Sequence, residues 1–186
     1  MYFQTDYASP VGKITLAGDG GHLTGLWLEG QKYFASTIKE EMHRKDSLPV
    51  FEAAKDWLDR YFSEKKPAIC ELPLAPAGSD FRQEVLKLLC EIPYGEVTTY
   101  GNLARKIAGK RNLPRMSAQA IGGAVSHNPI SIIIPCHRVV GTNGSLTGYA
   151  GGIDVKIKLL ELEGVNVSSK TTKNNRPVNR PQKVRP

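Results

Sequence analysis

A cysteine that directly follows a proline is the first candidate for chemistry in this 186-residue chain. Cys136 stands between Pro135 and His137. The proline ring restricts the backbone just before the cysteine, and an imidazole beside a thiol can lower the pKa of that thiol. The pattern therefore favours nucleophilic chemistry by a thiolate at Cys136. A Cys-His pair is not decisive alone, because neighbouring residues of a strand point to opposite faces.

The remaining cysteines and histidines show no metal-binding pattern. The three cysteines are widely spaced and form no Cys-x-x-Cys pair, and neither His22 nor His127 lies at a ligand spacing from them. We expect reduced thiols, no disulfide and no metal. Cys70, in a proline-rich stretch, and Cys90, on the apolar side of a helix, are interpreted as small hydrophobic residues.

The segments around Cys136 predict the elements that position it. Residues 130–134 form a continuous apolar, β-branched run, which is typical of a short buried strand. A Gly-rich loop follows over residues 141–152, and Asp154 can then cap a last helix that ends at Gly164. The sequence thus predicts an active-site strand that leads into Cys136, followed by a loop and a helix.

Three short helices are expected before this strand. Their candidate N-caps are Ser79 or Asp80, Thr98 or Thr99, and Ser117. The second and third, joined by a basic loop, resemble a helix-turn-helix, although many such pairs merely pack together. The third helix has little side-chain bulk, because it is rich in alanine and glycine. This thin surface suits either close packing on another helix or close approach to a nucleic-acid groove.

The first seventy residues have a different pattern. The apolar runs 13–17 and 23–28 flank a turn and predict a hairpin, and the spacing over 51–62 predicts a helix. Prolines at 67, 73 and 76 resist both helix and sheet. We expect an α/β fold of the α+β type, in which a β-hairpin domain with one helix precedes a mostly helical domain. The expected parts are a first domain (1–70), a linker (71–79), a second domain (80–167) and a basic, disordered tail (168–186).

The net charge of +7 is unevenly distributed. The interval between Glu96 and Asp154 holds six basic residues and no acid, as does the tail from residue 165, so the remainder of the chain is net acidic. A basic stretch in an acidic body can meet a phosphate backbone, although solvated surface charges give the same pattern. No run of eighteen apolar residues occurs, and residues 1–6 lack the features of a secretory signal. We therefore expect a cytoplasmic protein with no membrane partner.

The residues around the cysteine closely resemble one family. Residues 134–140 read Ile-Pro-Cys-His-Arg-Val-Val, with Gly122-Gly123 and Asn128-Pro129 before them and Tyr-Ala-Gly-Gly at 149–152. This pattern resembles the alkylguanine-DNA alkyltransferases, or methylated-DNA-protein-cysteine methyltransferases. The resemblance runs from about residue 81 to 164, and the β-rich first domain is similar to the N-terminal domain of bacterial members.

The resemblance implies DNA repair by direct reversal. A methyl or alkyl group would pass irreversibly from O6-alkylguanine in double-stranded DNA, with O4-methylthymine as a second candidate, to Cys136. The protein would act once, as a monomer and without a cofactor. By position, His137 would be the base that takes the thiol proton through a water and Glu163 would orient it. Asn128 would pin the turn before the cysteine, and Tyr100 would donate toward the base ring.

The same resemblance implies the contacts with DNA. The reactive atom lies inside the duplex, so the nucleotide must rotate out into a pocket. Backbone amides near Val139, Tyr149 and Ala150 would then read the guanine edge. The residues expected to contact DNA are Arg115, Ala118, Gln119, Gly122 and Arg138.

Two positions depart from the family pattern. Gln119 stands where many members carry an arginine that fills the gap left by the flipped base, so we expect weaker DNA binding or slower flipping. Ala150 replaces a serine of some relatives, which would widen the pocket. Some relatives also hold zinc in the first domain, but no cysteine precedes Cys70 here, so none is expected.

Two other functions are compatible with these residues. One is a module that recognises alkylated guanine without transferring the group, although such relatives lack the acceptor cysteine that Cys136 supplies. The other is a cysteine hydrolase with a Cys-His-Glu site, which would turn over repeatedly and would need an oxyanion hole.

Overall fold

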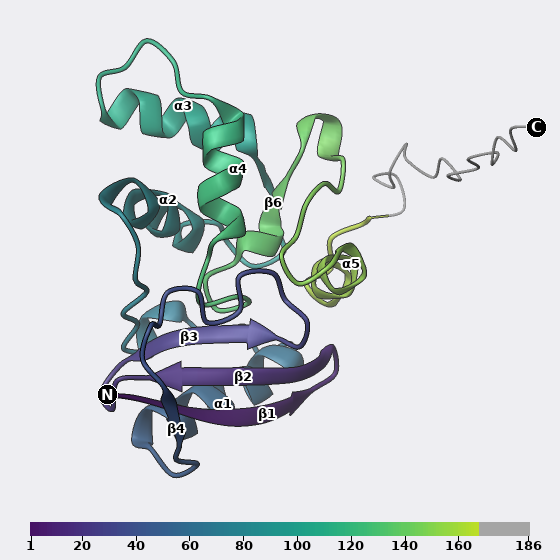
Figure 1. Cartoon of the computed structure of the whole chain (residues 1–186). Helices are drawn as coiled ribbons and strands as arrows, with labels where there is room; N and C mark the ends of the chain where they lie inside the picture. Colours follow the sequence, from purple (N-terminus) through teal and green to yellow (C-terminus); the bar gives the residue numbers. More distant parts are fainter. Residues whose placement is uncertain (168–186) are drawn as a thin grey trace, which may run out of the picture.

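A four-stranded sheet in the order β3-β2-β1-β4 forms the base of the first unit (Figure 1). The computed structural model describes residues 1–167, so the expected tail 168–186 lies outside the described residues. The strands are β1 (Tyr2–Ser9), β2 (Gly12–Gly18), β3 (Leu23–Leu28) and β4 (Met42–Arg44). The β2–β3 pair confirms the predicted hairpin, whereas the sequence did not predict β1 and β4.

Helix α1 (Pro49–Phe62) packs against this sheet and confirms the predicted helix. Proline at its first turn suits the unpaired N–H groups there, and its buried face includes Phe51, Trp57 and Leu58. A short 3-10 helix, η1 (Ile69–Glu71), follows in the proline-rich stretch. All residues of β3 are buried, because α1 contacts this strand and the second unit covers its edge.

The free edge of β3 is completed by two segments that are distant in sequence. The N–H of Leu23 donates to the carbonyl of Pro73, and the N–H of Leu26 donates to that of Pro129, both at 2.8 Å. The N–H of Ser131 returns a hydrogen bond to Leu26 at 3.0 Å. These bonds satisfy an edge that would otherwise expose backbone donors and acceptors. They also attach the segment before Cys136 to the first unit.

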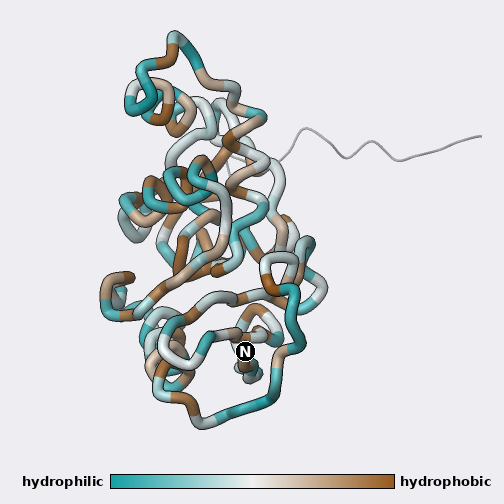
Figure 2. The backbone as a smooth tube through the Cα atoms, turned by 60° about the vertical axis from the view of Figure 1, so that its left-hand side comes forward, coloured by the Kyte–Doolittle hydropathy of each residue, from teal (hydrophilic) through white to brown (hydrophobic). Residues whose placement is uncertain are grey.

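The second unit contains the three predicted helices. They are α2 (Asp80–Cys90), α3 (Tyr100–Lys110) and α4 (Ala118–Ser126). Their N-caps are Ser79, Thr99 and Ser117, and each side chain accepts a backbone N–H of the first turn, as predicted. Helices α3 and α4 pack against each other, and the largely hydrophilic loop that connects them is at the top in Figure 2.

The predicted strand over residues 130–134 is wrong. Ile130 makes one isolated bridge with Leu26, and the following residues turn through Ile132, whose φ is +69°. Cys136 then begins a 3-10 helix, η2 (Cys136–Arg138), and leads to β6 (Val139–Val140), which pairs with β5 (Thr98–Thr99). The run is buried, as expected, but burial does not require a strand when a buried side chain supplies the hydrogen bonds.

Helix α5 (Ile153–Leu162) closes the described chain after the short η3 (Thr142–Gly144). Its N-cap is Gly152, so the predicted capping by Asp154 is wrong, and Asp154 instead lies in the first turn near the positive end of the helix dipole. Gly164 follows the C-cap with a φ of +79°, which glycine adopts readily. Cys90 is exposed at the end of α2, so its predicted place on the apolar side is also wrong.

One hydrophobic cluster extends through both units. It joins Leu16 and Leu26 of the sheet to Val85 of α2, Ile121 of α4 and Ile133 before the cysteine. Because the core is shared, the first unit fixes where the segment around Cys136 lies. No helix within residues 1–167 is both long and apolar enough to span a bilayer.

Candidate active site

Cys136 lies in the wall of a cavity of about 570 Å³ that is lined mostly by residues of the second unit. This residue is 4% exposed, and Pro135 directly precedes the helical turn that carries it. The wall includes Tyr100, the α4 residues Ala118, Gln119 and Gly122, and the loop from Thr147 to Ala150. A cavity of this size matches those that bind small organic molecules. The cysteine is therefore buried in the protein and open toward a pocket.

Asn128 holds the turn before the cysteine. Its Nδ2 donates to the carbonyl of Ile134 at 2.8 Å and contacts that of Ile130 at 3.3 Å, while its Oδ1 accepts the Ile130 N–H at 3.0 Å. The same Nδ2 lies 3.1 Å from Cys136 Sγ. These bonds replace the strand pairing that the sequence pattern suggested. Asn128 both shapes the turn and donates toward the sulfur.

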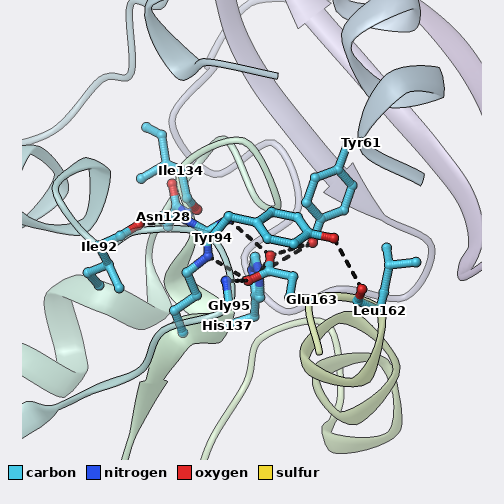
Figure 3. Close-up of polar contacts among 10 residues, drawn as sticks. Tyr61, Ile92, Tyr94, Gly95, Asn128, Ile134, His137, Leu162 and Glu163 are labelled. Atoms are coloured by element: carbon cyan, nitrogen blue, oxygen red, sulfur yellow. Dashed lines mark hydrogen bonds and ion pairs between the residues drawn. The ribbon is translucent and has the colours of Figure 1, made fainter. Parts of the chain in front are cut away.

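A buried acid–base pair lies next to Cys136. His137 Nε2 is 2.7 Å from Glu163 Oε1, and both side chains are completely buried (Figure 3). Because a carboxylate accepts, the proton of a neutral His137 lies on Nε2 and leaves Nδ1 with a free lone pair. Within residues 1–167, Nδ1 is buried and has no hydrogen-bond partner. This nitrogen is free to accept a proton.

Burial sets the protonation of these groups. Burial raises the pKa of the Cys136 thiol, against the lowering effects of the Asn128 hydrogen bond and the charge of Lys156. Burial likewise lowers the pKa of His137, although Glu163 raises it. Burial would raise the pKa of Glu163, but the hydrogen bonds and charges of His137 and Arg138 bring it to about 2. The resting site is thus a thiol beside a neutral imidazole, whereas the sequence favoured a thiolate.

Arg138 does not face the solvent, and its predicted contact with DNA is wrong. Its guanidinium binds Glu163 through Nε at 2.8 Å and Nη2 at 3.0 Å, and Nη1 donates to the carbonyl of Ile92 at 2.6 Å. The residue is 6% exposed. A buried carboxylate requires a compensating cation, and Arg138 supplies it. Arg138 therefore belongs to the site's internal charge network.

Two tyrosines flank the cavity near the sulfur. Tyr100 lies at the start of α3, and its hydroxyl donates weakly to the carbonyls of Thr147 and Gly148, each at 3.4 Å. Burial and then the charge of Cys136 raise the pKa of Tyr100 to about 12. The same two causes raise the pKa of Tyr149 well above its usual value. Both hydroxyls remain protonated at neutral pH. The Tyr100 hydroxyl can act as a donor into the cavity, whereas the Tyr149 hydroxyl is buried and has no hydrogen-bond partner within residues 1–167.

The predicted base-reading residues have different positions. Tyr149 and Ala150 line the cavity, and the carbonyl of Ala150 accepts the N–H of Lys32 at 3.0 Å. Val139 is fully buried behind the cysteine and does not line the cavity. Its N–H donates to the carbonyl of Cys136, so the expectation that this amide reads a guanine is wrong.

Lys156 is a member of the site that the sequence analysis missed. It lies on α5 with 0% exposure, and its Nζ donates to the carbonyls of Val139 at 2.6 Å and Thr147 at 3.3 Å. Burial lowers the pKa of Lys156 to about 8, and the charge of Cys136 opposes that change. A sequence signal existed, because Lys156 precedes the buried Leu159 and Leu160 by three and four residues. A charged side chain on an apolar stripe indicates a site.

Helix α4 presents its small residues to the cavity. Ala118 and Gln119 are exposed at its N-terminal end, whereas Ile121, Ala124 and Val125 pack inward. The thin surface thus leaves room on the open side of the helix, which favours the approach of a ligand over close helix packing. Arg115 is exposed in the loop before α4 and lines a second hollow of about 310 Å³.

The first unit also reaches the cavity, which no sequence pattern indicated. Lys32 and Tyr33, in the loop after β3, form part of its wall. The Tyr33 ring stacks on His127 at the end of α4, with 3.8 Å between ring centroids. Within residues 1–167, no group of three or more His, Cys, Asp or Glu side chains has a geometry suited to a metal ion.

The sequence matches two known domains in tandem. Residues 2–76 match the ribonuclease-like domain of 6-O-methylguanine DNA methyltransferase, and residues 80–165 match the DNA-binding domain of the same protein. Together the two matches span most of the chain. They define a DNA-binding methyltransferase whose second domain contains Cys136, His137 and Glu163.

Individual relatives agree with this class. The methylated-DNA-protein-cysteine methyltransferase of Haemophilus influenzae is 41% identical over 94% of this chain and 93% of its own length. The crystal structure of Mycobacterium tuberculosis O6-methylguanine methyltransferase is 39% identical, with a TM-score of 0.72 over 94% of this chain and 97% of that chain. A structure of the M. tuberculosis protein in complex with DNA has a TM-score of 0.71, at 42% identity over 87% of this chain and 91% of that chain.

The chain therefore belongs to the 6-O-methylguanine DNA methyltransferase family. Its activity is that of a methylated-DNA-protein-cysteine methyltransferase, a DNA-repair enzyme that works by direct reversal.

Proposed function

We propose that Cys136 is the acceptor cysteine and takes the alkyl group from O6-alkylguanine in double-stranded DNA. The observation that carries this assignment is the position of Sγ, which faces a 570 Å³ cavity and is 3.1 Å from the Asn128 amide. The other two cysteines, Cys70 and Cys90, are exposed and lie outside this cavity. Cys136 is thus the cysteine whose surroundings can hold a flipped base.

The thiol proton leaves through His137. Nδ1 is the free nitrogen of this imidazole, and Nε2 donates to Glu163, which balances the charge of the imidazolium. A water between Sγ and Nδ1 would carry the proton. The thiolate that forms is stabilised by the Asn128 amide and by the charge of Lys156. This arrangement follows the logic of a nucleophile, a base and an orienting acid.

The transfer is an in-line displacement at a saturated carbon. The S–C bond forms as the bond from that carbon to O6 breaks, and the electron pair moves onto the guanine ring. Tyr100 donates a hydrogen bond to the departing guanine, because its hydroxyl is protonated and borders the cavity. The thioether product is not hydrolysed. The protein therefore reacts once per molecule, without a cofactor.

Access to the lesion requires the nucleotide to rotate out of the duplex, because O6 lies within the stack. Helix α4 supports this step, since its residues Ala118, Gln119 and Gly122 line the cavity. Gln119 would fill the gap in the duplex, and Arg115 would contact a phosphate from the adjacent loop. The backbone around Tyr149 and Ala150 would read the guanine edge.

Several further features stay predictions. We expect a first domain over 1–70, a linker over 71–79 and a second domain over 80–167, and the matched ranges 2–76 and 80–165 agree with a boundary shortly before residue 80. A monomeric state, a cytoplasmic location and action on O4-methylthymine rest on the resemblance and the composition alone.

The test is the intact mass of the protein after reaction with an oligonucleotide that carries O6-methylguanine. We expect one added methyl group per molecule, and peptide mapping should place it on Cys136. Cys136→Ser should receive none, whereas Cys90→Ser, which changes an exposed cysteine, should react like the parent protein.

Two outcomes contradict the proposal. Binding of the lesion with no added mass would indicate a recognition module, and demethylated DNA in excess of protein would indicate a hydrolase that turns over. A methyl group on Cys70 or Cys90 would overturn the assignment of Cys136.

A further inference from the structure

A tyrosine of the first unit reaches the acid–base pair of the second. Tyr61 lies in the last turn of α1 and is 1% exposed. Its hydroxyl donates to Glu163 Oε1 at 2.7 Å, and its oxygen is 3.4 Å from His137 Nε2 (Figure 3). The contact joins residues that are 102 positions apart in the chain.

Donors surround the carboxylate of Glu163. Oε1 accepts from Tyr61, His137 Nε2 and Arg138 Nη2, while Oε2 accepts from Arg138 Nε and from the N–H of Gly95 at 3.2 Å. An ionised carboxylate has about four acceptor sites, so this one is fully used. Among the donors to this carboxylate within residues 1–167, Tyr61 belongs to the first unit and the others belong to the second.

Contacts with two aromatic side chains fix the ring of Tyr61. It stacks on Trp57 at 5.4 Å and meets Tyr94 edge-on at 6.0 Å, measured between ring centroids. The Tyr61 oxygen therefore stays beside Nε2 of His137. Its position favours the orientation in which Nε2 points at Glu163 and Nδ1 stays free.

We propose that Tyr61 is a positioning residue of the alkyl-transfer site, which makes the proton relay depend on the docked first unit. This inference rests on the proposed role of His137 and Glu163. Tyr61 and His137 both donate to Oε1 of Glu163. The bond from Tyr61 withdraws negative charge from that oxygen, so Oε1 is a weaker acceptor for His137 than it would be without Tyr61. Loss of the hydroxyl would both loosen the imidazole and make it more basic.

The imidazole has a defined set of charged and titratable neighbours. Lys156 faces it from α5 and Glu163 from the residue after that helix, Cys136 and Arg138 adjoin it in η2, and Tyr61 faces it from α1. Tyr61→Phe changes one of them and keeps the ring. The matched control is Tyr7→Phe, which removes a hydroxyl that donates to Asp59 at the surface of the first unit, away from the cavity.

The experiment measures the single-turnover rate of methyl transfer against pH. Tyr61→Phe should react about tenfold more slowly at neutral pH, a factor typical of one hydrogen bond to a charged group. The acid limb of its profile should shift to higher pH, because a more basic His137 is protonated sooner. Tyr7→Phe should match the parent protein.

Nitrogen NMR of His137 provides a reading that does not depend on activity. The parent protein should show the proton on Nε2, and Tyr61→Phe should show a raised imidazole pKa or mixed tautomers. An unchanged rate and profile would overturn the role of Tyr61, and so would a slower rate with an unshifted limb and an unchanged imidazole. If the parent protein is methylated on Cys136 in the same assay, the proposed function stands in either case.

Discussion

The side-chain amide of Asn128 lies 3.1 Å from the sulfur of Cys136 and 2.8 Å from the carbonyl of Ile134. One buried side chain thus shapes the backbone before the nucleophile and donates to the nucleophile itself. Structure and reactivity are coupled at this residue.

Replacing Asn128 by alanine should impair both properties. Several buried groups lose their partners, so we expect about 3 kcal/mol less stability toward urea. Methyl transfer should slow as well, since the sulfur loses a donor. Asn102→Ala is the control, because Asn102 bonds to Arg105 near the surface, and it should cost less than about 1 kcal/mol. Equal losses in the two variants would contradict the structural role.

Arg138 should matter for the stability of the protein, whereas Arg115 should matter for the salt dependence of its DNA affinity. Arg138→Met leaves Glu163 buried without its cation, which should cost about 3–5 kcal/mol of stability. Arg115→Met should leave stability unchanged but lower the salt dependence of DNA affinity by about one in the log–log slope. Urea unfolding and DNA titration at several salt concentrations separate the two effects. A flattened slope for a folded Arg138→Met protein would restore Arg138 as a phosphate contact.

Lys156 should make stability depend on pH in the alkaline range. Its pKa is about 8 in the folded protein, against 10.5 for an ordinary lysine, so between these values the unfolded chain binds more protons. Stability should therefore rise from pH 8 toward 10, by up to roughly 3 kcal/mol for this residue alone. Above pH 10 the buried tyrosines, whose pKa values are raised, act in the opposite direction.

The measurement is the difference in unfolding free energy between the parent protein and Lys156→Met at pH 7.5, 8.5 and 9.5. We expect the difference to change steadily over this range in favour of the parent. A constant difference would show that Lys156 keeps an ordinary pKa.

Gln119 is predicted to limit the handling of duplex DNA. Gln119→Arg adds a charged donor at an exposed position of the cavity wall, so binding and repair of duplex should improve by about 1 kcal/mol, roughly fivefold in affinity. On a single-stranded oligonucleotide there is no gap to fill, and the advantage in rate should disappear. An unchanged or slower rate on duplex contradicts the prediction.

Tyr33 is predicted to limit the size of the alkyl group. Its ring forms part of the cavity wall and is held there by stacking on His127, so Tyr33→Ala should speed the transfer of a butyl group several-fold relative to methyl. Phe34→Ala is the matched control, because Phe34 is equally exposed but packs against Trp27 outside the cavity. The ratio of the two rates is the quantity to compare.

Local signals predicted the helices well, because their caps are local. Ser79, Thr99 and Ser117 each accept a bond from within two or three residues, so the pattern contains the information. The strand over 130–134 was wrong for the opposite reason. Its β-branched residues suit a strand, but the bonds from Asn128 and the bridge to Leu26 impose a turn.

In the site too, the features set by the local sequence could be predicted, and those set by distant contacts could not. Cys136, His137 and Glu163 could be named from the motif, and their geometry then fits the roles assigned to them. Charge alone cannot say whether an arginine is exposed, so Arg138 was placed on DNA instead of on Glu163. The contact of Tyr61 with the site could not be predicted, because this residue reads as one more apolar position of α1 until the two units are docked.

The edge of β3 has a consequence for the melting of the molecule. The outer edge of this strand bonds to Pro73, before α2, and to Pro129 and Ser131, after α4, so its partners lie on both sides of the second unit's first three helices. If the two units separated, the backbone N–H and C=O groups at this edge would lose their hydrogen-bond partners on both sides. Heating should therefore unfold residues 1–167 in a single cooperative transition, in which the turn that carries Cys136 unfolds together with the sheet.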